Sequence, residues 1–404
     1  MRFLLLNQFF PPDDAPTGQL LSDVARALAA GGHSVTVVCA GTAYADGGHA
    51  GGREAPGFTV RSLPAVGFGH GHVARLSSYA SFYVGALYHT LFGPRPDVVL
   101  TLTTPPLLSL IGTLMKLLRG ARHFSWEMDV YPDIAVDLAV LRRGSFLDRA
   151  IGALADFSRR RADRVIALGA SMRGRLIARG TPSDKIAVAE NWADGSVISP
   201  RPFPPHLPLT VLYSGNLGRA HDVDTIEETM ESLADPARFR FVFAGAGPRR
   251  DRLEARCRSA NITSAVYIPY QDRARLGEHL GSCHIGLVTQ HPATCGSVVP
   301  SKTYALMAAG RPFLYIGPAG GTPAQMIERF GCGWRIEPGD SAALVDLLQA
   351  LASDPDLVHA AGGRARQAFL EHYDLPQGVG RILDILGVAQ TSRKQPSPAR
   401  PAAV

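Results

Sequence analysis

The stretch SPRPFPPHLP, residues 199–208, decides how the chain is divided. It carries five prolines in ten residues, and proline lacks the backbone N–H that helices and central strands need. Such a stretch is typical of a linker. Because 404 residues also exceed one ordinary core, the sequence predicts two domains, residues 1–198 and 209–389. The last helix of the second domain is expected to cross back to the first domain. Residues 390–404, rich in Pro, Ser, Ala and basic side chains, are predicted to be a disordered tail.

Short apolar runs alternate with helical patterns on both sides of this linker. Near-continuous apolar runs are typical of parallel strands that are covered on both faces. The predicted strands are residues 2–7, 35–40, 97–102, 164–168 and 185–191, then 209–215, 239–245, 284–289 and 312–317. A helix is predicted over residues 18–30, ended by Gly31 and Gly32. The pattern predicts the α/β class, with two Rossmann-like, doubly wound domains that face each other across a cleft.

Composition narrows the classes of protein. Hydrophobic residues make up 46% and charged residues 19%, as in folded globular proteins. The cysteines show no close metal-type spacing, so we interpret them as reduced core residues of a cytoplasmic protein. No secretory signal is apparent, because the apolar run at the start ends at Asn7. The longest apolar stretch, residues 98–118, contains two prolines and Lys116 and is not predicted to span a membrane.

The net charge of +6 is unevenly placed. Ten arginines, but only three aspartates, fall between Ala139 and Arg179. Two interpretations stay open: a solvated helix surface, or a face that meets anionic lipid or phosphate. Residues 66–92 add aromatic side chains that suit a headgroup boundary, although a helix packed within the first domain explains them equally well. We expect peripheral, salt-sensitive contact with the inner face of the membrane. Nucleic acid is not an expected partner, because no binding module accompanies the charge.

In doubly wound domains, ligands bind at the carboxyl ends of the strands. Two loops fit that place. NQFFPPDDAPTG, residues 7–18, leaves the first strand and is long for a simple turn; its last residue, Gly18, lets a ligand approach the backbone. YSGNLGRA, residues 213–220, follows the first strand of the second domain and combines glycines with Arg219, whose guanidinium suits a phosphate.

A third stretch, GSVVPSKTYALMAAGRP, residues 296–312, predicts a short helix that begins with Lys302. The helix dipole disfavours a lysine in the first turn. A bound anion between the helix N-terminus and the lysine would make a lysine favourable there, because the backbone N–H groups and the ammonium would both bind the anion. The alternative is a solvent-exposed lysine near a helix start. We favour a pyrophosphate at Lys302.

Three carboxylates follow a strand-like run in SWEMDVYPD, residues 125–133. Glu127, Asp129 and Asp133 are candidates to bind an acceptor hydroxyl or to act as a base. Their spacing is not that of an Asp-x-Asp metal motif, so no metal is expected.

Together these stretches resemble the retaining sugar-nucleotide glycosyltransferases of the GT-B fold, family four. The similarity covers nearly the whole chain except the tail. It is greatest to the bacterial polysaccharide branch that adds N-acetylhexosamines or related sugars. The matching segments are FFPPDDAPTG, YPDIA, ENWAD, YSGNLGR, FAGAGPRRDRLE and VPSKTYALMAAGRP.

The resemblance implies a nucleotide-sugar donor, held mainly by the second domain, and no cofactor or metal. It implies that Lys302, Asp129 and Arg219 serve catalysis, with Glu127 and Asp133 on the acceptor side. Retention in this family is thought to proceed by front-face attack, so a protein nucleophile is not required. The residues implied to line the donor are Gly18, Gly215, Asn216, Gly218, Gly245, Gly247, Tyr270, Val299, Pro300, Ser301 and Thr303.

The sequence also departs from the family pattern. Many members carry two glutamates eight positions apart, where this chain has Ser297 and Ala305. The usual Arg and Lys after the first strand of the second domain appear as Asn216 and His221, and a frequent acceptor-loop histidine appears as Met128. The leading hypothesis is a retaining transferase that uses a UDP-N-acetylhexosamine type donor and a glycan or lipid-linked acceptor. The alternatives are a GT-B sugar-nucleotide epimerase and a binding subunit that has lost catalysis.

Overall fold

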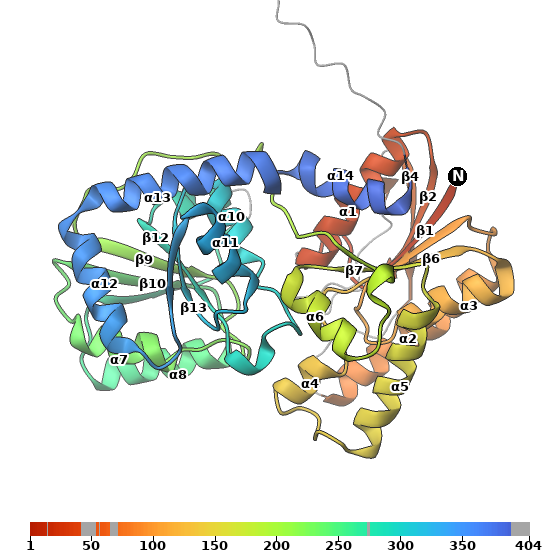
Figure 1. Cartoon of the computed structure of the whole chain (residues 1–404), viewed down its shortest axis with the longest axis horizontal. Helices are drawn as coiled ribbons and strands as arrows, with labels where there is room; N and C mark the ends of the chain where they lie inside the picture. The colour runs from red at the N-terminus through yellow and green to blue at the C-terminus, as the bar shows by residue number, and fades with distance from the viewer. Residues whose placement is uncertain (14, 42–53, 56, 65–71, 273–274, 389–404) are drawn as a thin grey trace, which may run out of the picture.

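The computed structural model describes residues 1–13, 15–41, 54–55, 57–64, 72–272 and 275–388. Two sheets lie on either side of the proline-rich linker, each flanked by helices (Figure 1). This confirms the predicted α/β class and the two-domain GT-B architecture. The predicted tail, residues 390–404, lies outside the described residues.

The first sheet has eight strands in the order β3-β4-β2-β1-β5-β6-β7-β8. All are parallel except β3, which runs antiparallel to β4. The strands are β1 Arg2–Leu6, β2 Ser34–Ala40, β3 Glu54–Ala55, β4 Phe58–Leu63, β5 Val98–Thr101, β6 Arg122–Trp126, β7 Arg164–Ala167 and β8 Ile186–Val188. The helices are α1 Pro16–Ala30, α2 His72–Phe92, α3 Ser109–Arg119, α4 Asp133–Asp137, α5 Phe146–Arg161 and α6 Ala170–Ala178.

The second sheet has six parallel strands in the order β11-β10-β9-β12-β13-β14. They are β9 Leu209–Ser214, β10 Phe239–Ala244, β11 Ala265–Ile268, β12 Ile285–Thr289, β13 Phe313–Ile316 and β14 Gly333–Ile336. The helices are α7 Asp224–Ser232, α8 Pro248–Ser259, α9 Leu276–Gly281, α10 Lys302–Ala308, α11 Thr322–Phe330, α12 Ser341–Ser353 and α13 Pro355–Ala368. In both sheets the strand order reverses beside the first strand, β1 or β9, so each domain has a ligand-binding edge that faces the other domain.

Local chemistry explains several of these helices. α1 begins at Pro16, whose fixed φ suits the first helical position. Ser145 caps α5 by accepting a hydrogen bond from the backbone N–H of Asp148. α10 is only seven residues long, so its dipole is small. Any anion bound there depends on the side chain of Lys302 more than on the helix.

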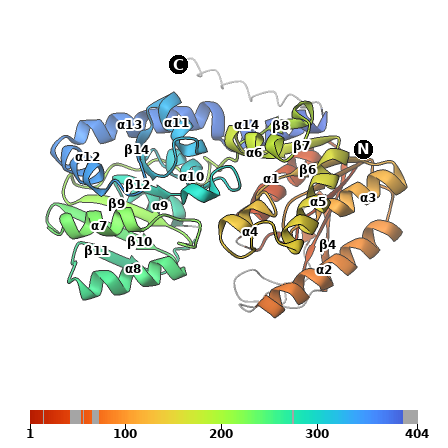
Figure 2. The same ribbon diagram turned by 60° about the horizontal axis from the view of Figure 1, so that its bottom comes forward.

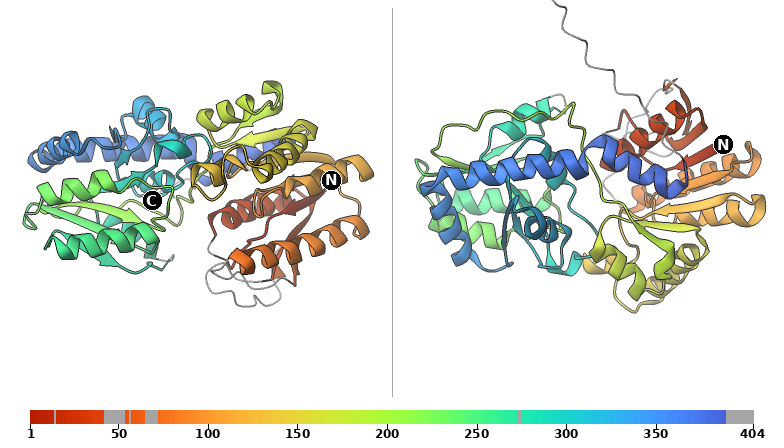
Figure 3. Two further views of the ribbon diagram at one scale, coloured as in Figure 1. Left: turned by 90° about the horizontal axis from the view of Figure 1, so that it is seen from below. Right: turned by 45° about the horizontal axis from the view of Figure 1, so that its top comes forward.

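The chain returns to the first domain at its end. A π-helical turn, Phe369–Tyr373, joins α13 to α14, Leu375–Leu386. These helices run along one side of both domains (Figure 3). α14 packs against α1, and its residues Val379 and Ile382 belong to the first domain's core. Asp374 caps α14 and also accepts a hydrogen bond from the backbone N–H of Gly195.

The proline-rich linker is held against the second domain. One nitrogen of the buried Arg311 donates to the carbonyl oxygens of Arg201, Pro202 and Gly281 at 2.7–3.0 Å. The same guanidinium lies 4.0 Å from the ring centroid of Phe203. The sequence of the linker predicts only a domain boundary, but in the structure the linker is bound to the surface of the second domain.

Candidate active site

A cavity of about 440 Å³ opens between the two domains. Its first wall comes from α1 and the segment after β8, and its second from the start of α10 and from apolar side chains of the second domain. The lining residues are Pro16, Gln19, Leu20, Asp23, Arg26, Asn191, Trp192, Ala193, Asp194, Val197, Ile198, Leu212, Ser214, Leu276, Leu280, Leu287, Ser301, Lys302, Ala305 and Leu306. This volume suits a medium-sized ligand.

Two cationic residues line this cavity: Arg26, which is paired with Asp23, and Lys302. The Lys302 ammonium donates a hydrogen bond to the hydroxyl of Tyr213 at 2.8 Å and lies 4.4 Å from the centroid of the same ring. Within the described part of the chain, no carboxylate forms an ion pair with it. Burial lowers the pKa of Lys302 to about 8. Half-buried and without a counter-ion, this ammonium is suited to an anionic ligand.

His221 lies behind Lys302 but adds no charge. Its Nδ1 lies 2.9 Å from the carbonyl oxygen of Thr289, which assigns the ring proton to that nitrogen. Its Nε2 faces the Tyr213 hydroxyl at 3.3 Å. Burial, with a smaller effect of Lys302, lowers the pKa of His221 to about 3. The histidine is neutral at pH 7, so it does not replace the cation that the family carries at this position.

Two glycine turns from neighbouring strands stack beneath Lys302. A β-carbon at Gly215, after β9, would lie 2.7 Å from the Lys302 Cε atom. A β-carbon at Gly245, after β10, would lie 2.3 Å from the Gly215 carbonyl oxygen, and its φ of +118° is a conformation that favours glycine. A β-carbon at Gly247 would lie 2.6 Å from Asn216 Oδ1. The structure therefore brings together Gly215, Asn216, Gly245, Gly247 and Lys302, as the sequence predicts.

The other residues predicted to bind the donor differ in solvent exposure. Asn216, Arg219, Tyr270 and Ser301 are exposed, with Pro300 and Gly218 half-buried. The Tyr270 ring lies beside Gly245. By contrast, Val299 and Thr303 are buried. Val299 packs into the first domain's core, and the Thr303 hydroxyl donates to the Pro300 carbonyl oxygen. These two side chains have structural contacts, and a contact of either residue with the donor stays a prediction.

Gly18 is buried in the first turn of α1, where its backbone N–H donates to the Ala15 carbonyl oxygen. A β-carbon there would lie 3.0 Å from both the Phe9 carbonyl oxygen and the Phe10 Cα atom. Close packing of the loop after β1 thus explains this glycine, and Gly18 is not on the cavity lining. Its contact with a donor diphosphate stays a prediction.

Asp129 lies where the domains meet. Its backbone N–H donates to Thr103 Oγ1 at 3.2 Å, and it forms a β-bridge with Val298 of the second domain. Its carboxylate accepts no hydrogen bond from the described residues. Burial, with a smaller effect of Glu127, raises the pKa of Asp129 to about 6. Of the three predicted carboxylates, Asp129 alone combines a carboxylate that accepts no described hydrogen bond with a position at the domain contact, although it is not among the residues that line the cavity.

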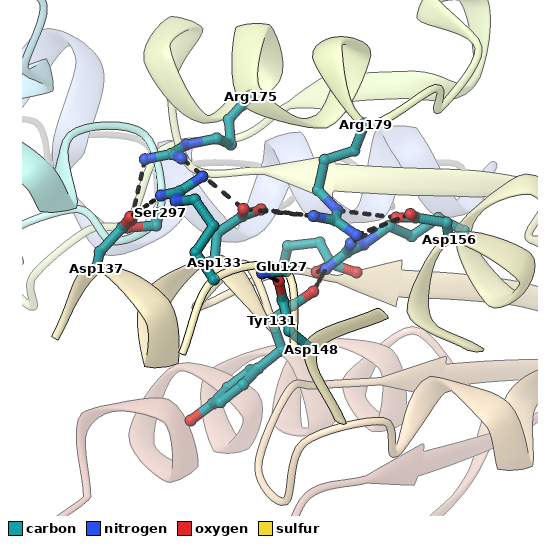
Figure 4. A network of polar contacts seen from close by, with 12 residues as sticks. Glu127, Tyr131, Asp133, Asp137, Asp148, Asp156, Arg175, Arg179 and Ser297 are labelled. Carbon is teal, nitrogen blue, oxygen red and sulfur yellow. Dashed lines mark hydrogen bonds and ion pairs between the residues drawn. The ribbon is translucent and has the colours of Figure 1, made fainter. Parts of the chain in front are cut away.

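Glu127 and Asp133 are engaged elsewhere. Glu127 is buried, paired with Arg159 at 2.9 Å, and accepts a hydrogen bond from the Ser125 hydroxyl at 2.8 Å. Asp133 is paired with Arg179 at 3.3 Å. Neither side chain lines the cavity. Figure 4 shows them within a network of arginines and carboxylates in the first domain, so the structure does not support their prediction as acceptor ligands.

Asn191 is a cavity residue that the sequence prediction missed. It is 4% exposed and lines the cavity, and its Oδ1 has no hydrogen-bond partner among the described residues. A buried carbonyl oxygen without a partner is costly, and a hydroxyl or N–H group of a ligand would satisfy it. The segment ENWAD is a part of the resemblance, but nothing in its sequence distinguishes a ligand contact from a turn residue.

The described residues include no cluster of three or more His, Cys, Asp or Glu side chains arranged to hold a metal ion. A search of the same residues for a helix that is long and apolar enough to cross a bilayer finds none.

Comparison with known families decides the class of protein. The glycosyl transferase 4-like domain matches residues 17–192, and the glycosyl transferases group 1 family matches residues 199–368. Each match covers one of the two structural domains. The chain is a glycosyltransferase, with a glycosyl transferase 4-like first domain and a group 1 second domain.

Two curated relatives are similar over most of this glycosyltransferase. The probable glycosyltransferase WbjE of Pseudomonas aeruginosa is 28% identical over 69% of this chain and 71% of its own length. The putative colanic acid biosynthesis glycosyl transferase WcaI of Escherichia coli (strain K12) is 26% identical over 85% of this chain and 90% of its own.

Solved structures share the fold at low identity. Sucrose-phosphate synthase from Thermosynechococcus elongatus superposes with a TM-score of 0.77 at 15% identity, covering 96% of this chain and 98% of its own. Anabaena HepE in complex with UDP superposes with a TM-score of 0.70 at 12% identity, covering 96% and 100%. These likenesses confirm the GT-B fold of this glycosyltransferase.

Proposed function

We propose that this glycosyltransferase takes a sugar from a nucleoside diphosphate, of the UDP-N-acetylhexosamine type, and transfers it with retention of configuration. The acceptor is a glycan or lipid-linked saccharide of cell-surface polysaccharide synthesis. The observation that carries the proposal is the Lys302 ammonium, which has no described counter-ion and opens on the cavity between the domains. The names of WbjE and WcaI, a glycosyltransferase and a colanic acid enzyme, favour a polysaccharide acceptor.

The chemistry follows from the charge that develops. The acceptor hydroxyl oxygen attacks the anomeric carbon, the bond from that carbon to the diphosphate oxygen breaks, and the diphosphate leaves with the bonding electrons. Lys302 neutralises that charge, so the residues present require no divalent ion. The acceptor proton passes to the leaving phosphate oxygen or to the carboxylate of Asp129, whose pKa of about 6 leaves it ionised at pH 7.

The UDP complex of HepE supports uracil as the base. In this chain the apolar end of the cavity, formed by Leu276, Leu280 and Leu287, offers a surface for a base, with Tyr270 close to the glycine turns. The polar wall of Gln19, Asn191 and Asp194 would then face sugar hydroxyls.

A screen of nucleotide sugars tests the proposal. Thermal stabilisation identifies the donor, and release of the nucleoside diphosphate with an oligosaccharide acceptor establishes transfer. Stabilisation by a UDP-sugar with acceptor-dependent UDP release is the expected result. Stabilisation without any release indicates the binding-subunit alternative. Interconversion of the sugar indicates the epimerase alternative.

We further propose peripheral membrane contact, through one part of the charge run and not through the whole of it. Arg159 is 2% exposed and paired with Glu127, and Arg175 and Arg179 are paired with aspartates. These three arginines are not free to meet lipid, whereas Arg160 and Arg161 are exposed. In the predicted aromatic segment, Phe82 is buried and Phe68 lies outside the described residues. Leu87, Tyr88 and Phe92 of α2 are exposed, so a contact of this helix with lipid stays a prediction.

One surface that combines exposed apolar and exposed basic side chains surrounds the entry to α5. Phe146 is 88% exposed, with Val140 and Leu147 also exposed, and Arg142 and Arg149 lie exposed between and beside them. We call these residues, 140–149, the α5 tip. It directly follows α4 in the chain, and α4 lies beside the second domain (Figure 2). Apolar side chains that insert at the headgroup boundary and arginines that meet anionic lipid would hold the enzyme next to a lipid-linked acceptor.

Vesicle co-sedimentation tests this surface. The expected result is binding to anionic vesicles that weakens with salt, with Phe146→Ser, and with Arg142→Glu combined with Arg149→Glu. The control is Arg238→Glu combined with Arg240→Glu, two exposed arginines of the second domain. Equal recovery with neutral and anionic vesicles, or equal loss in the control, removes this surface from the proposal.

A further inference from the structure

The two domains are joined close to the active site by a set of contacts separate from the linker. α6 of the first domain docks on residues 293–298, the loop that leads into α10. One nitrogen of Arg175 donates to the carbonyl oxygens of Cys295 at 3.0 Å and Ala293 at 3.3 Å. The same nitrogen donates to Asp137 Oδ2 at 3.0 Å. Arg175 thus binds both the first domain's α4 and the second domain's loop.

Ser297 completes the contact from the other side. Its hydroxyl lies 2.8 Å from Asp137 Oδ2, and its carbonyl oxygen accepts a hydrogen bond from the Val130 backbone N–H at 2.8 Å. The hydroxyl also lies 3.0 Å from the Thr294 carbonyl oxygen, but the charged acceptor is the stronger one. We call Arg175, Asp137 and Ser297 the interdomain clasp (Figure 4).

The two domains pack closely around the clasp. Gly296 has a φ of +80°, and a β-carbon there would lie 2.8 Å from the Ser171 carbonyl oxygen of α6. Val299 of the second domain, 6% exposed, lies in the hydrophobic core of the first. A backbone approach this close and a shared core favour one defined arrangement over a sliding interface.

The clasp is joined to a partly buried network of ion pairs that also holds residues 127–133. Arg175 of the clasp lies 3.8 Å from Asp133. Asp133 is also paired with Arg179, and Arg179 is paired with Asp156 at 2.8 Å. Asp156 is paired with Arg159, which binds Glu127. Buried charges are stable only when they are paired, so these residues hold one another in place. The chain of contacts runs from Glu127, two residues before Asp129, to Ser297, five residues before Lys302.

From these contacts we infer that Arg175, Asp137 and Ser297 are positioning residues, which set the closed arrangement of the two domains. In this arrangement Asp129 forms its β-bridge with Val298, which lies four residues before Lys302 in the chain. The inference about catalysis rests on the proposed function, but the inference about closure does not. Ser297 stands where many relatives by resemblance carry glutamate; here that position serves contact between the domains.

Small-angle X-ray scattering of the full chain tests closure without any substrate. Ser297→Ala removes one hydroxyl, and Asp137→Asn removes the charge that both partners share. Both variants are expected to show a larger radius of gyration than the wild type. The control is Ser232→Ala, whose hydroxyl bonds only within its own helix, and it should match the wild type. If Asp137→Asn does not fold, Ser297→Ala decides. An unchanged radius of gyration in Ser297→Ala overturns the inference.

Kinetics then separate positioning from general structural damage. With the donor identified by the screen, kcat of Ser297→Ala should fall by about 10-fold, while donor KM and UDP affinity stay within about twofold. The double variant Asp137→Asn with Ser297→Ala should lose no more than Asp137→Asn alone, because Ser297 acts through Asp137. Additive losses, or a weakened UDP affinity with unchanged kcat, contradict the positioning role. If the wild type binds no nucleotide, the proposed function fails and the scattering result still stands.

Discussion

The ammonium of Lys302 lies 2.8 Å from the hydroxyl of Tyr213, and among the described residues that hydroxyl is its only hydrogen-bond partner. A neutral partner in place of a carboxylate leaves the positive charge available. The hydroxyl also lies 2.7 Å from the Asn216 carbonyl oxygen, to which it donates, so it is oriented to accept from the lysine. Tyr213 therefore orients the Lys302 side chain without neutralising its positive charge.

Tyr213→Phe should keep the ring under the ammonium but lose this orientation. UDP affinity is expected to fall by about 3- to 10-fold, the range for one hydrogen bond to a charged group in a partly solvated site. The alkaline limb of activity should also move to lower pH, because the ammonium loses an acceptor that stabilises its charged form. Titration calorimetry and a pH series measure the two effects. An unchanged affinity and limb would assign Tyr213 to packing alone.

The pH profile of kcat/KM should be bell-shaped. Activity should rise as Asp129, with a pKa of about 6, loses its proton, and fall as Lys302, with a pKa of about 8, loses its own. Asp129→Asn should abolish the acid limb, and Lys302→Arg should move the alkaline limb upward. A flat profile between pH 5 and 9 would remove both groups from the rate-determining chemistry.

The same shifts fix the sign of two stability effects. Asp129 binds a proton more tightly in the folded chain, so its contribution to stability falls as the pH rises from about 4 to 6. Lys302 binds its proton less tightly when folded, so its contribution rises from about pH 8 to 10.5. Urea unfolding across these pH windows measures how the free energy of unfolding changes with pH. The contribution of Asp129 should be absent in Asp129→Asn, and that of Lys302 should be absent in Lys302→Met.

The glycine turns give a steric prediction. Gly245→Ala places a β-carbon 2.3 Å from the Gly215 carbonyl oxygen at a positive φ. It should destabilise the protein by about 1–3 kcal/mol and displace the turn beneath Lys302, so UDP affinity should fall. Gly218→Ala is the matched control, because its β-carbon would meet nothing closer than Asn216 Nδ2 at 3.6 Å. Equal stability of the two variants, measured by thermal unfolding, would contradict the tight stacking of the turns.

Sequence patterns predicted the local features well. Buried parallel strands are nearly all apolar, and the loops at their carboxyl ends follow at once in the chain, so Gly215, Gly245 and Lys302 were visible as candidates. Their convergence also follows from the strand order of a doubly wound sheet. Asp129 was one of three similar carboxylates, and sequence alone does not show which of them is left free.

The domain contact was not predictable in the same way. Asp137 and Ser297 are 160 residues apart, and nothing local to either one indicates the other. The arginine run between 139 and 179 has the composition of a solvated face, yet Arg159 is buried because Glu127 and Asp156 lie across from it. Pairing between distant segments decides whether such a charge lies inside or outside, and a single sequence does not record that pairing.

The central claim, that Lys302 holds the donor diphosphate, also predicts a large kinetic effect. Lys302→Ala should lower turnover by about 30- to 1,000-fold, the loss of one charge-assisted contact to a developing anion. Turnover within about threefold of the wild type would exclude Lys302 as a diphosphate ligand.

Calorimetry of UDP binding in the presence of a chelator, at pH 8.5 and in two buffers of different ionisation enthalpy, tests this claim most directly. An anion beside Lys302 raises its pKa, so the wild type should take up a fraction of a proton as UDP binds. Lys302→Met should bind UDP about 10- to 100-fold more weakly and take up no proton at this residue. UDP binding that strictly requires a divalent ion, or equal affinity and proton uptake in Lys302→Met, would contradict the account.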